Sequence, residues 1–360
     1  MSSRLVPVEG IPRPYAWGSL TAIPELLGLP ATGEPVAELW FDRQLPFLLK
    51  ILAADKALSI QVHPNLDQAV AGFASENRRG IPVDAPGRNY RDANHKPELL
   101  CAITPFDALC GFRPVPDTLR LFDALQVEAL DQIRAALVSS EGLKGAFTTV
   151  MATSEAERGP LIDQILMGCR RLAGSAGEWQ RAASAVVSAA SDFPGDIGAV
   201  VALFLNAVHL APGEAIYLDA GNVHAYLRGT GVEIMANSDN VLRSGLTPKH
   251  VDVPELLRIA DFTDLVDPRC PWLEEDSNVR RFLTPARDFE LAIVTLDDGA
   301  PEPLVSRAVD QILLCTAGSA TVTAGDQEVE LEPGRAVLVP AETATGCRGS
   351  GTLFRASTPI

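Results

Sequence analysis

The stretch PGEAIYLDAGNVHAYLRGTGVEIMA, residues 212–236, decides the fold. Short apolar runs alternate with turn residues, and this pattern predicts β-strands over 215–218 and 224–227. Gly221 stands in the turn that separates them. A strand, a turn and a returning strand of this kind present His224 to the interior of a sheet or barrel.

Two β-rich parts of the chain flank a helical part. Residues 1–112 contain strand-like apolar runs such as 48–52, and residues 311–340 repeat short strands between glycine- and proline-containing turns. Residues 115–205 are rich in alanine and have apolar positions at helical spacing, which predicts four or five helices. Strands at this spacing are typical of a sandwich or a closed barrel. The sequence therefore predicts a mainly β protein with a helical insertion.

Two connecting segments contain further signals. Asp196 follows a Pro-Gly pair and predicts the N-cap of a last helix over 197–208, because an aspartate side chain accepts hydrogen bonds from the first helical N–H groups. Residues 66–95 are polar and predict a long surface loop with a short helix over 66–73. A loop of this length inside a compact domain is usually functional.

The charge balance restricts the partners. The chain has 360 residues with 46 acidic and 30 basic side chains, so its formal net charge is −16. Nucleic acid and anionic membranes attract clustered Lys and Arg, and this balance argues against both. A phosphorylated substrate would also be repelled at long range. Its site therefore requires a local cluster of cations and hydrogen-bond donors.

Other global features predict a cytoplasmic protein. No run of about 18 apolar residues predicts a membrane span, and the N-terminal segment lacks the pattern of a secretion signal. The six cysteines are widely spaced without a C-x-x-C pair, which predicts buried free thiols. We expect a monomer or a weak homodimer.

Four residues form a candidate metal site. Gln61 and His63 are two apart in a strand-like segment, so their side chains share a face. Glu98 and His224 come from two further strand-like segments. Two imidazoles, a carboxylate and an amide oxygen suit zinc or another first-row divalent ion and leave room for water or substrate. Each histidine alone is explained as well by an ordinary hydrogen-bonded residue, so spacing by itself leaves both interpretations open.

The motifs around these residues resemble the type I phosphomannose isomerases. The longest match is GVEIMANSDNVLRSGLTPK, residues 231–249. The matches keep the family's order between about residues 5 and 262, and the tail beyond about residue 275 resembles only a generic cupin-like barrel. The shorter matching segments are 15–18, 37–40, 46–52, 61–64, 94–98, 194–198 and 212–224.

The resemblance implies a fold of two cupin, or jelly-roll, β-barrels with a helical domain. The boundaries that we expect are 1–114 for the first part of the catalytic barrel, 115–208 for the helical insertion, 209–265 for the rest of that barrel and 266–360 for a C-terminal barrel. Family members usually have a longer segment between Trp40 and Pro46. Its absence removes a surface loop and leaves the metal ligands in place.

The resemblance also implies the activity and the site. Such enzymes interconvert D-mannose 6-phosphate and D-fructose 6-phosphate. The positions of the family's single zinc ion are Gln61, His63, Glu98 and His224. Arg243 occupies the position of an arginine that the family requires for activity. His95 occupies a position for which the role of a catalytic acid or base has been considered. Positions that line the family's substrate pocket are Trp17, Lys50, Ser59, Lys96, Tyr226, Glu233, Asp239 and Lys249.

The chemistry of the reaction supports several of these roles. Aldose–ketose interconversion proceeds through an enediolate and requires a base that moves a proton between carbons. Glu233 is the first choice for this base, and His95 and Lys96 are the other candidates. In an alternative interpretation, Glu233 is not the base and its carboxylate only orients Arg243. Zinc and Arg243 can stabilise the developing oxygen charge.

The sequence also offers donors for the substrate's phosphate group and leaves two competing functions to consider. The donors available for a phosphate are Lys50, Ser59, Arg243 and Lys249. One competing function is a cupin that binds metal and sugar phosphate without turnover, and Arg243 and Glu233 argue against it. Another is an iron-dependent oxygenase, against which Gln61 and the phosphate donors favour zinc.

Overall fold

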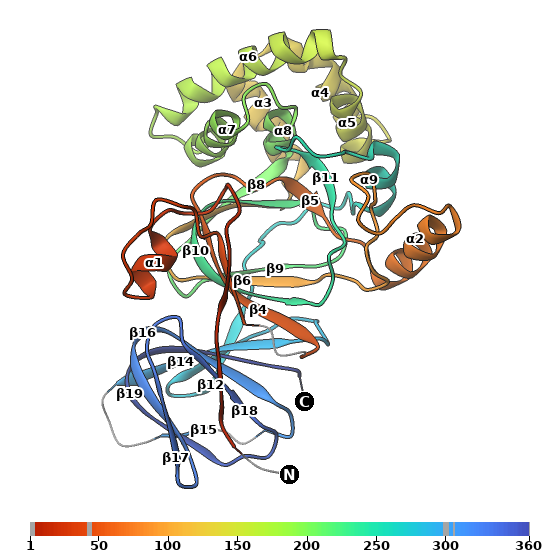
Figure 1. Ribbon diagram of the computed structural model, residues 1–360. Helices are drawn as coiled ribbons and strands as arrows, with labels where there is room; N and C mark the ends of the chain where they lie inside the picture. Colours follow the sequence, from red (N-terminus) through yellow and green to blue (C-terminus); the bar gives the residue numbers. More distant parts are fainter. Residues whose placement is uncertain (1–3, 42–44, 298–301, 305–306, 360) are drawn as a thin grey trace.

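The computed structural model describes residues 4–41, 45–297, 302–304 and 307–359. Three layers follow one another along the molecule (Figure 1): a helical layer, a first sheet in the middle and a second sheet at the far end. Both ends of the chain lie beside the second sheet. The first sheet is therefore covered by helices on one side and by the second sheet on the other.

The first sheet is antiparallel and is centred on one long strand. This strand, β10 (His224–Ala236), pairs with β4 (Phe47–Ala54), β5 (Ile60–Val62), β6 (Glu98–Ala102) and β7 (Phe106–Phe112). The other described strands of this sheet are β2 (Ile11–Arg13), β3 (Glu38–Phe41), β8 (Leu205–Leu210), β9 (Ala215–Leu218) and β11 (Leu242–Gly245).

Strand β10 joins two segments that look separate in the sequence. Its first residues pair with β5 and β7, and its residues from Gly229 onward pair with β4, with β6 beside them from Gly231. Gly229 stands at the change of partners with a φ of +125°. A Cβ atom there would lie 2.7 Å from the Pro105 carbonyl oxygen. The strand continues through the turn-like residues because glycine permits this conformation.

Alternation along β4 and β10 separates the two faces of the first sheet. Ile51 and Val232 are fully buried in a hydrophobic core that includes residues of the second sheet. Lys50 and Glu233 alternate with them and lie directly opposite each other in the strand register. Since successive side chains of a strand point to opposite faces, Lys50 and Glu233 project away from the second sheet.

The second sheet is also antiparallel and includes the first strand of the chain. Strand β1 (Val6–Val8) pairs with β18 (Ala336–Val339). Phe47 of the first sheet and Phe354 of the second belong to one core cluster, so apolar burial joins the two sheets. The other described strands are β12 (Trp272–Asp276), β13 (Val279–Phe282), β14 (Glu290–Asp297), β15 (Glu302–Leu304), β16 (Gln311–Ala324), β17 (Gln327–Leu331) and β19 (Thr345–Ser357).

Residues 115–204, all of which the structure describes, form the helical layer. They contain six α-helices where we expected four or five. The elements are α3 (Val115–Leu125), η1 (Glu128–Leu130), α4 (Asp131–Leu137), α5 (Gly142–Met151), α6 (Glu155–Ala173), α7 (Gln180–Asp192), α8 (Gly198–Val201) and η2 (Ala202–Phe204).

The predicted helix over 197–208 is wrong in its second half. The helical turns end at Phe204, and residues 205–210 form β8, which pairs with β7. A short apolar run fits a helix and a strand equally well. The unpaired edge of β7 decides between them, because it offers backbone hydrogen bonds to a strand.

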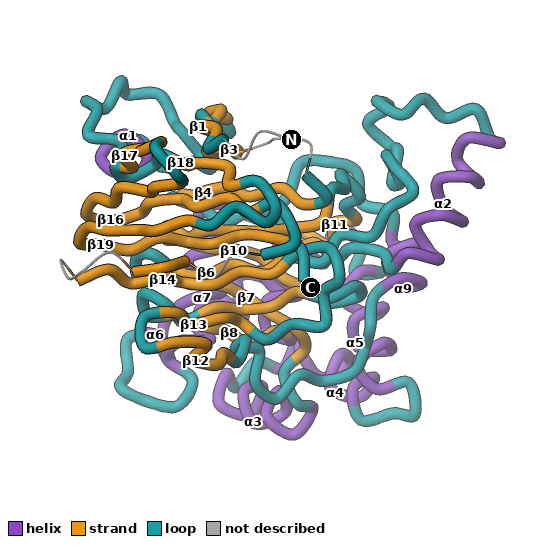
Figure 2. Tube along the Cα trace, turned by 90° about the horizontal axis from the view of Figure 1, so that it is seen from below, coloured by secondary structure: helices purple, strands orange, loops and turns teal. Residues whose placement is uncertain are grey.

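Further helices, outside the helical layer, lie at the sides of the first sheet. Helix α2 (Leu66–Arg78) projects from the side of the molecule (Figure 2) and is five residues longer than predicted. It begins with a capping box between Asn65 and Gln68. The other two are α1 (Ala22–Leu26) and α9 (Val253–Ile259). None of the described helices combines the length and the apolar character needed to cross a membrane. All six cysteines are buried and free, as predicted.

An aromatic cluster joins the helical layer to the first sheet. The Phe147 ring of α5 meets Phe112 of β7 edge-on at a centroid distance of 5.9 Å and Phe262 at 5.6 Å. Phe147 is fully buried. Aromatic pairs of this geometry add to the free energy gained from burial, so this cluster fixes the helical layer on the sheet.

We expect Phe147→Ala to lower the free energy of unfolding by about 3–5 kcal/mol, because it leaves a cavity between the layers. Urea unfolding followed by circular dichroism measures the change. Met167→Ala on α6 is the matched control, since its side chain is 68% exposed, and it should change stability by less than about 0.5 kcal/mol. Equal losses in both variants would contradict this role of Phe147.

Candidate metal centre and active site

Three strands bring the four predicted metal ligands together. Gln61 of β5 and His224 at the start of β10 are direct partners across the two strands. His63 follows β5, and its carbonyl oxygen accepts a hydrogen bond from the Gly221 N–H in the turn before His224. Glu98 begins β6, which pairs with the far half of β10. The ligands therefore converge because β10 contacts both other segments.

His63, Glu98 and His224 form a compact buried cluster. The Glu98 Oε2 atom lies 3.5 Å from His63 Nε2 and 3.3 Å from His224 Nε2. The candidate ligand atoms of the three residues lie within 4.8 Å of one another. Two imidazole nitrogens and a carboxylate oxygen at this spacing fit a first-row divalent ion such as zinc.

Hydrogen bonds turn both imidazoles so that Nε2 faces the cluster. His63 Nδ1 donates to the Asn240 carbonyl oxygen at 2.7 Å, and His224 Nδ1 donates to the Asn222 carbonyl oxygen at 3.0 Å. A carbonyl oxygen only accepts, so Nδ1 has the proton and Nε2 of the neutral ring has a lone pair. His63 Nε2 and Glu98 Oε2 are buried without a hydrogen-bond partner. Such atoms are costly, and a cation between them would satisfy both.

Gln61 can complete the ligand set. Its Nε2 atom lies 3.3 Å from His224 Nε2. The oxygen and nitrogen of an amide have nearly the same shape, and half a turn of the side-chain amide exchanges them. In that orientation the amide oxygen faces the cluster as a neutral fourth ligand.

Electrostatics keeps these residues in the state that a metal ion requires. Lys96 Nζ lies 3.0 Å from Glu98 Oε1. Burial would raise the pKa of Glu98, but the charge of Lys96 is the largest of the effects that hold it well below its usual value. Burial and the charge of Lys96 lower the pKa of His63 to about 4. At neutral pH Glu98 is therefore ionised and His63 is neutral, as metal ligands must be.

A second buried cluster surrounds Glu233. Lys50 Nζ lies 2.6 Å from Glu233 Oε2 and 3.0 Å from Glu38 Oε1. The Tyr226 hydroxyl donates to Glu233 Oε1 at 2.5 Å. Burial raises the pKa of Glu233, and the negative charge of Glu98 adds to this effect, although Lys50 opposes it. A buried carboxylate with a raised pKa is suited to accept and return a proton.

The two clusters contain more negative than positive charge. Apart from the imidazoles and Tyr226, their buried ionisable side chains are the carboxylates Glu38, Glu98 and Glu233 and the ammonium groups Lys50 and Lys96. Burial would lower the pKa of Lys50, but Glu233 and Glu38 raise it, so Lys50 remains charged. With all five ionised, one negative charge is left over. A divalent cation at Glu98 reverses this sign, which favours its binding.

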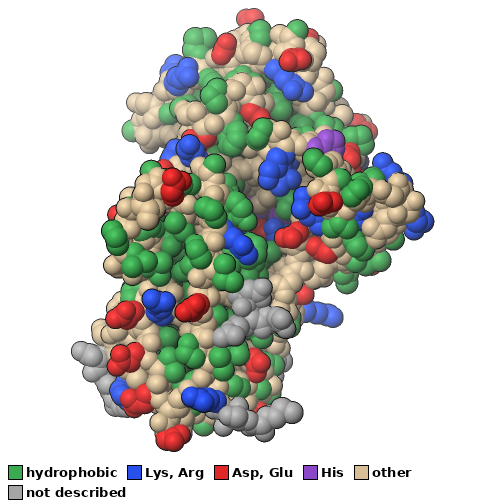
Figure 3. Space-filling model, viewed as in Figure 1, with side chains coloured by type: hydrophobic (Ala, Val, Ile, Leu, Met, Phe, Trp, Pro, Cys, Tyr) green, Lys and Arg blue, Asp and Glu red, His purple; other side chains and the backbone are tan. Residues whose placement is uncertain are grey.

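Arg243, Lys249 and Arg91 form a cationic group beside the clusters. Arg243 of β11 lies opposite Gln61 in the strand register. Burial and Arg91 lower the pKa of Arg243, and burial, Arg243 and Arg91 lower the pKa of Lys249. No carboxylate is among the described groups that shift either pKa. Lys and Arg side chains, with Asp and Glu side chains among them, border a hollow below the helical layer (Figure 3). Cations without a carboxylate partner suit a phosphate monoester.

His95 has a partner outside the cluster. Its Nε2 atom lies 2.9 Å from Asp288 Oδ2, in the loop between β13 and β14 of the second sheet. Its neighbour Lys96 instead contacts Glu98. Since successive residues alternate in direction along an extended segment, His95 faces the second sheet, and its chemical role stays a prediction.

The other predicted pocket residues lie at the margin of the site. Trp17 stacks on Tyr15 at a centroid distance of 5.8 Å and packs on the core cluster that contains Tyr226. Ser59 directly precedes β5. Asp239 is exposed, and its N–H donates to Asp92 at 2.7 Å. Their contacts with substrate stay predictions.

Several residues that were not predicted from the sequence hold the ligands in place. The Asn240 side chain accepts a hydrogen bond from Arg91 N at 2.7 Å and donates to the Asn94 carbonyl oxygen at 2.8 Å. Asp92 accepts further bonds from residues 238–240. Glu38 orients Lys50. Glu38 and Asn240 stand inside the matched motifs, and that position is the signal that identifies them.

Comparison with known proteins agrees with this arrangement. Residues 41–115 match the family model described as the catalytic domain of type I phosphomannose isomerase. The mannose-6-phosphate isomerase of Escherichia coli strain K12 is 34% identical in an alignment that covers 95% of this chain and 96% of the relative. The chain belongs to the type I phosphomannose isomerase family. The bovine mannose-6-phosphate isomerase is 30% identical, with 90% of this chain and 89% of the relative covered.

Solved structures extend the similarity to the whole chain. A crystal structure of a variant phosphomannose isomerase from Salmonella typhimurium has a TM-score of 0.89 at 32% identity, with 100% of both chains covered. A zinc-bound mannose 6-phosphate isomerase has a TM-score of 0.88 at 32% identity, with the same coverage. The family predicted from the sequence motifs is confirmed.

One departure from the family concerns the length of this chain. The Escherichia coli alignment spans 404 positions, more than the 360 residues of this chain, so the relative has segments that this chain lacks. We predicted one such difference between Trp40 and Pro46. Residues 42–44 of that connection lie outside the described part of the chain.

We expect Glu98→Gln to lower the affinity for added zinc by at least about a hundredfold, because an amide lacks the negative charge that the cation requires. Equilibrium dialysis followed by elemental analysis measures this. Asp107→Asn is the matched control, since Asp107 lies 2.8 Å from His209 in an exposed pair. Wild-type zinc content in the Glu98 variant would exclude Glu98 as a ligand.

Proposed function

We propose that this chain is a zinc-dependent isomerase that interconverts D-mannose 6-phosphate and D-fructose 6-phosphate. The buried cluster of His63, Glu98 and His224, with its unpartnered Nε2 and Oε2 atoms, carries the proposal. Together with Gln61 these residues would hold one zinc ion. All of them come from one chain, so the site requires no second copy.

Positive charge is needed where negative charge develops on the sugar oxygens. Zinc, when bound, would supply a Lewis acid that holds and polarises these oxygens. Arg243 lies opposite Gln61 on the neighbouring strand. Its guanidinium can donate to the same developing charge at no reorganisation cost, because the strand fixes its position.

The cationic group beside the site is where the phosphate group of the substrate would bind. Arg243 and Lys249 are the donors that we assign to it, because their charges lack a described carboxylate partner. Lys50 contacts Glu38 and Glu233 instead. We assign Lys50 to the sugar end of the pocket, where it holds Glu233. The other residues proposed to line the pocket are Trp17, Ser59, Tyr226 and Asp239.

Glu233 is the group that we propose to move the proton. It is buried beside Glu98, and its pKa is raised, which brings its basicity closer to that of a base working at neutral pH. Tyr226 and Lys50 hold its two oxygens. His95 and Lys96 are the alternatives, and Lys96 is the nearer to the metal ligands because it contacts Glu98.

We also propose the finer architecture that the family implies. Each antiparallel sheet would be a cupin-type barrel, with the catalytic barrel formed by 1–114 and 209–265, the helical domain by 115–208 and the second barrel by 266–360. Strand β1 is an exception, because it pairs with β18. Strand β8 also extends the catalytic sheet from inside the helical range.

The activity is tested by following fructose 6-phosphate formation from mannose 6-phosphate in a coupled assay. We expect turnover by the zinc-loaded protein, loss of at least about 99% of it after chelation, and recovery when zinc is added. Calcium, which prefers oxygen-rich sites, is the control addition and should restore nothing. Turnover that survives complete zinc removal would contradict the zinc assignment. No turnover with zinc bound would favour a binding protein.

We expect Glu233→Gln to lower kcat by at least about a hundredfold with zinc retained, because the amide cannot accept the proton. Activity of the wild type should fall as the pH decreases through the raised pKa of Glu233, above the usual range of a carboxyl group. Stopped assays at several pH values measure both effects.

Two further variants separate the candidates for the base. Glu38→Gln removes the other carboxylate on Lys50 and should lower kcat much less than Glu233→Gln. His95→Asn should lower it less than about tenfold. A larger fall of kcat in the His95 variant would identify His95 as the base instead of Glu233.

A further inference from the structure

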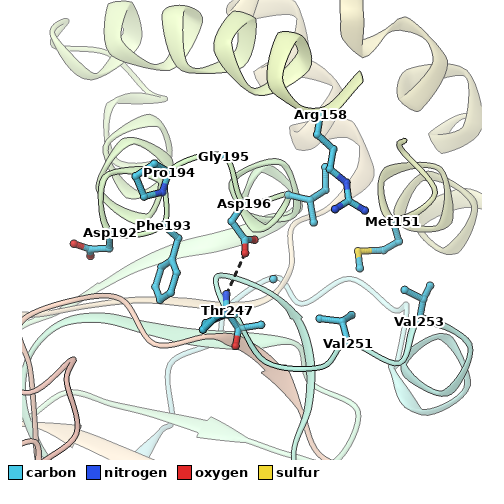
Figure 4. Close-up of a pocket in the computed structure, with 13 residues that line it drawn as sticks. Met151, Arg158, Asp192, Phe193, Pro194, Gly195, Asp196, Thr247, Val251 and Val253 are labelled. Carbon is cyan, nitrogen blue, oxygen red and sulfur yellow. Dashed lines mark hydrogen bonds between the residues drawn. The ribbon is translucent and has the colours of Figure 1, made fainter. Parts of the chain in front are cut away.

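One aspartate connects the helical layer to the end of strand β11. Asp196 lies in the turn between α7 and α8. Its Oδ1 atom accepts hydrogen bonds from Gly198 N at 2.7 Å and from Leu246 N at 2.7 Å, and its Oδ2 atom accepts one from Thr247 N at 3.1 Å. Two of these donors follow β11, so the carboxylate joins the two layers (Figure 4).

The backbones of the two layers touch at the same place. A Cβ atom on Gly198 would lie 2.5 Å from Leu246 N, and one on Gly245 would lie 2.4 Å from the Gly198 Cα atom. Gly245 has a φ of +147° and Leu246 has a φ of +52°. A left-handed conformation is unfavourable for leucine. The backbone conformation of Gly245 and Leu246 therefore depends on interactions with residues outside this segment. The hydrogen bonds that Asp196 accepts provide these interactions.

The held segment lies between the two cations of the phosphate site. Arg243 is two residues before Gly245, and the pairing of β11 with β5 becomes irregular between these residues. Thr247 Oγ1 accepts a hydrogen bond from Lys249 N at 3.1 Å. A continuous series of hydrogen bonds thus leads from Asp196 through Thr247 to Lys249.

Leu246 is buried in the core that includes the helical layer, but Thr247 and Pro248 after it border a cavity of about 610 Å³. The lining includes Met151 and Arg158 from the helical layer on one side and Thr247, Val251 and Val253 on the other (Figure 4). A surface that faces a cavity lacks the dense contacts that position side chains elsewhere in a protein interior.

We propose that Asp196 is a positioning residue of the phosphate site, whose carboxylate determines where Lys249 lies relative to Arg243 and the metal ligands. The inference rests on the proposed function, in which these two cations bind the sugar phosphate. Asp196 itself does not touch the substrate. The helical layer thereby contributes to substrate binding through one side chain.

Asp196→Asn tests this role with little change of size. The amide keeps one acceptor oxygen for Gly198 and Leu246, but its NH₂ group faces the Thr247 N–H, and two donors cannot bond to each other. Thr247 then loses its partner, and the backbone of Lys249 loses its fixed position.

The measurements are the KM for mannose 6-phosphate and the inhibition constant of inorganic phosphate. In the zinc-loaded Asp196→Asn variant we expect both to rise about tenfold, with a smaller fall of kcat, because displaced cations weaken phosphate binding first. Zinc content should equal that of the wild type. Asp310→Asn is the control, since Asp310 accepts a hydrogen bond from Ala341 N at 2.8 Å in the second sheet, and it should change neither constant.

A double-mutant cycle with Lys249→Ala shows whether Asp196 acts through Lys249. If it does, the two effects are not additive, and Asp196→Asn raises the phosphate inhibition constant little further once Lys249 is removed. Thr247→Val removes the Oγ1 acceptor and leaves Asp196 in place. It should reproduce part of the rise, and it serves as the test if the Asp196 variant does not fold.

Three results would overturn the proposal: an unchanged phosphate inhibition constant in a folded, zinc-loaded variant, additive effects in the cycle, or a Lys249→Ala variant that binds phosphate as the wild type does. In each case the wild-type protein still isomerises its substrate. A wild-type protein without isomerase activity would instead contradict the proposed function.

Discussion

A buried carboxylate between two imidazoles and an ammonium group is the constraint on which the site depends. Moving a charged carboxylate from water into the interior costs several kcal/mol unless charges and hydrogen bonds offset it. At Glu98 the offset comes from Lys96, because the Nε2 lone pairs of His63 and His224 face the carboxylate and cannot donate to it. One buried carboxylate oxygen still lacks a hydrogen-bond partner. His63 Nε2 next to it is also without a hydrogen-bond partner, and a cation between the two atoms would satisfy both.

The first sheet provides this arrangement through strand alternation. Every second side chain of β4, and Val232 and Ile234 of β10, belong to the core shared with the second sheet. Lys50 and Glu233 lie between these residues and face the site. Apolar burial against the second sheet thus stabilises the strands that position the charged residues. The helical layer acts from the other side, where the Phe147 cluster fixes it and Asp196 contacts the end of β11.

Particular residues show how far sequence reasoning extends. The strands around His224 and the helix after His63 could be predicted, because period-two patterns and capping residues are local signals. The helix predicted over 197–208 failed at Leu205, where pairing with β7 outweighed the helical pattern. His95 looked equivalent to Lys96, yet it pairs with Asp288, 193 positions away. Asp196 was predicted as the N-cap of the helix over 197–208, but the N-cap residue is Ile197, and the Asp196 side chain accepts hydrogen bonds from Gly198, Leu246 and Thr247.

The sequence by itself determined the family, the reaction class and the candidate ligand set, because these depend on residue types in a fixed order within matched motifs. Only the tertiary structure decided which side chains meet. Glu38 contacts Lys50, Asn240 orients His63 and Asp196 holds the segment before Lys249. Hydrogen bonds between distant residues arise when layers pack, and packing depends on the whole set of buried surfaces rather than on any local pattern.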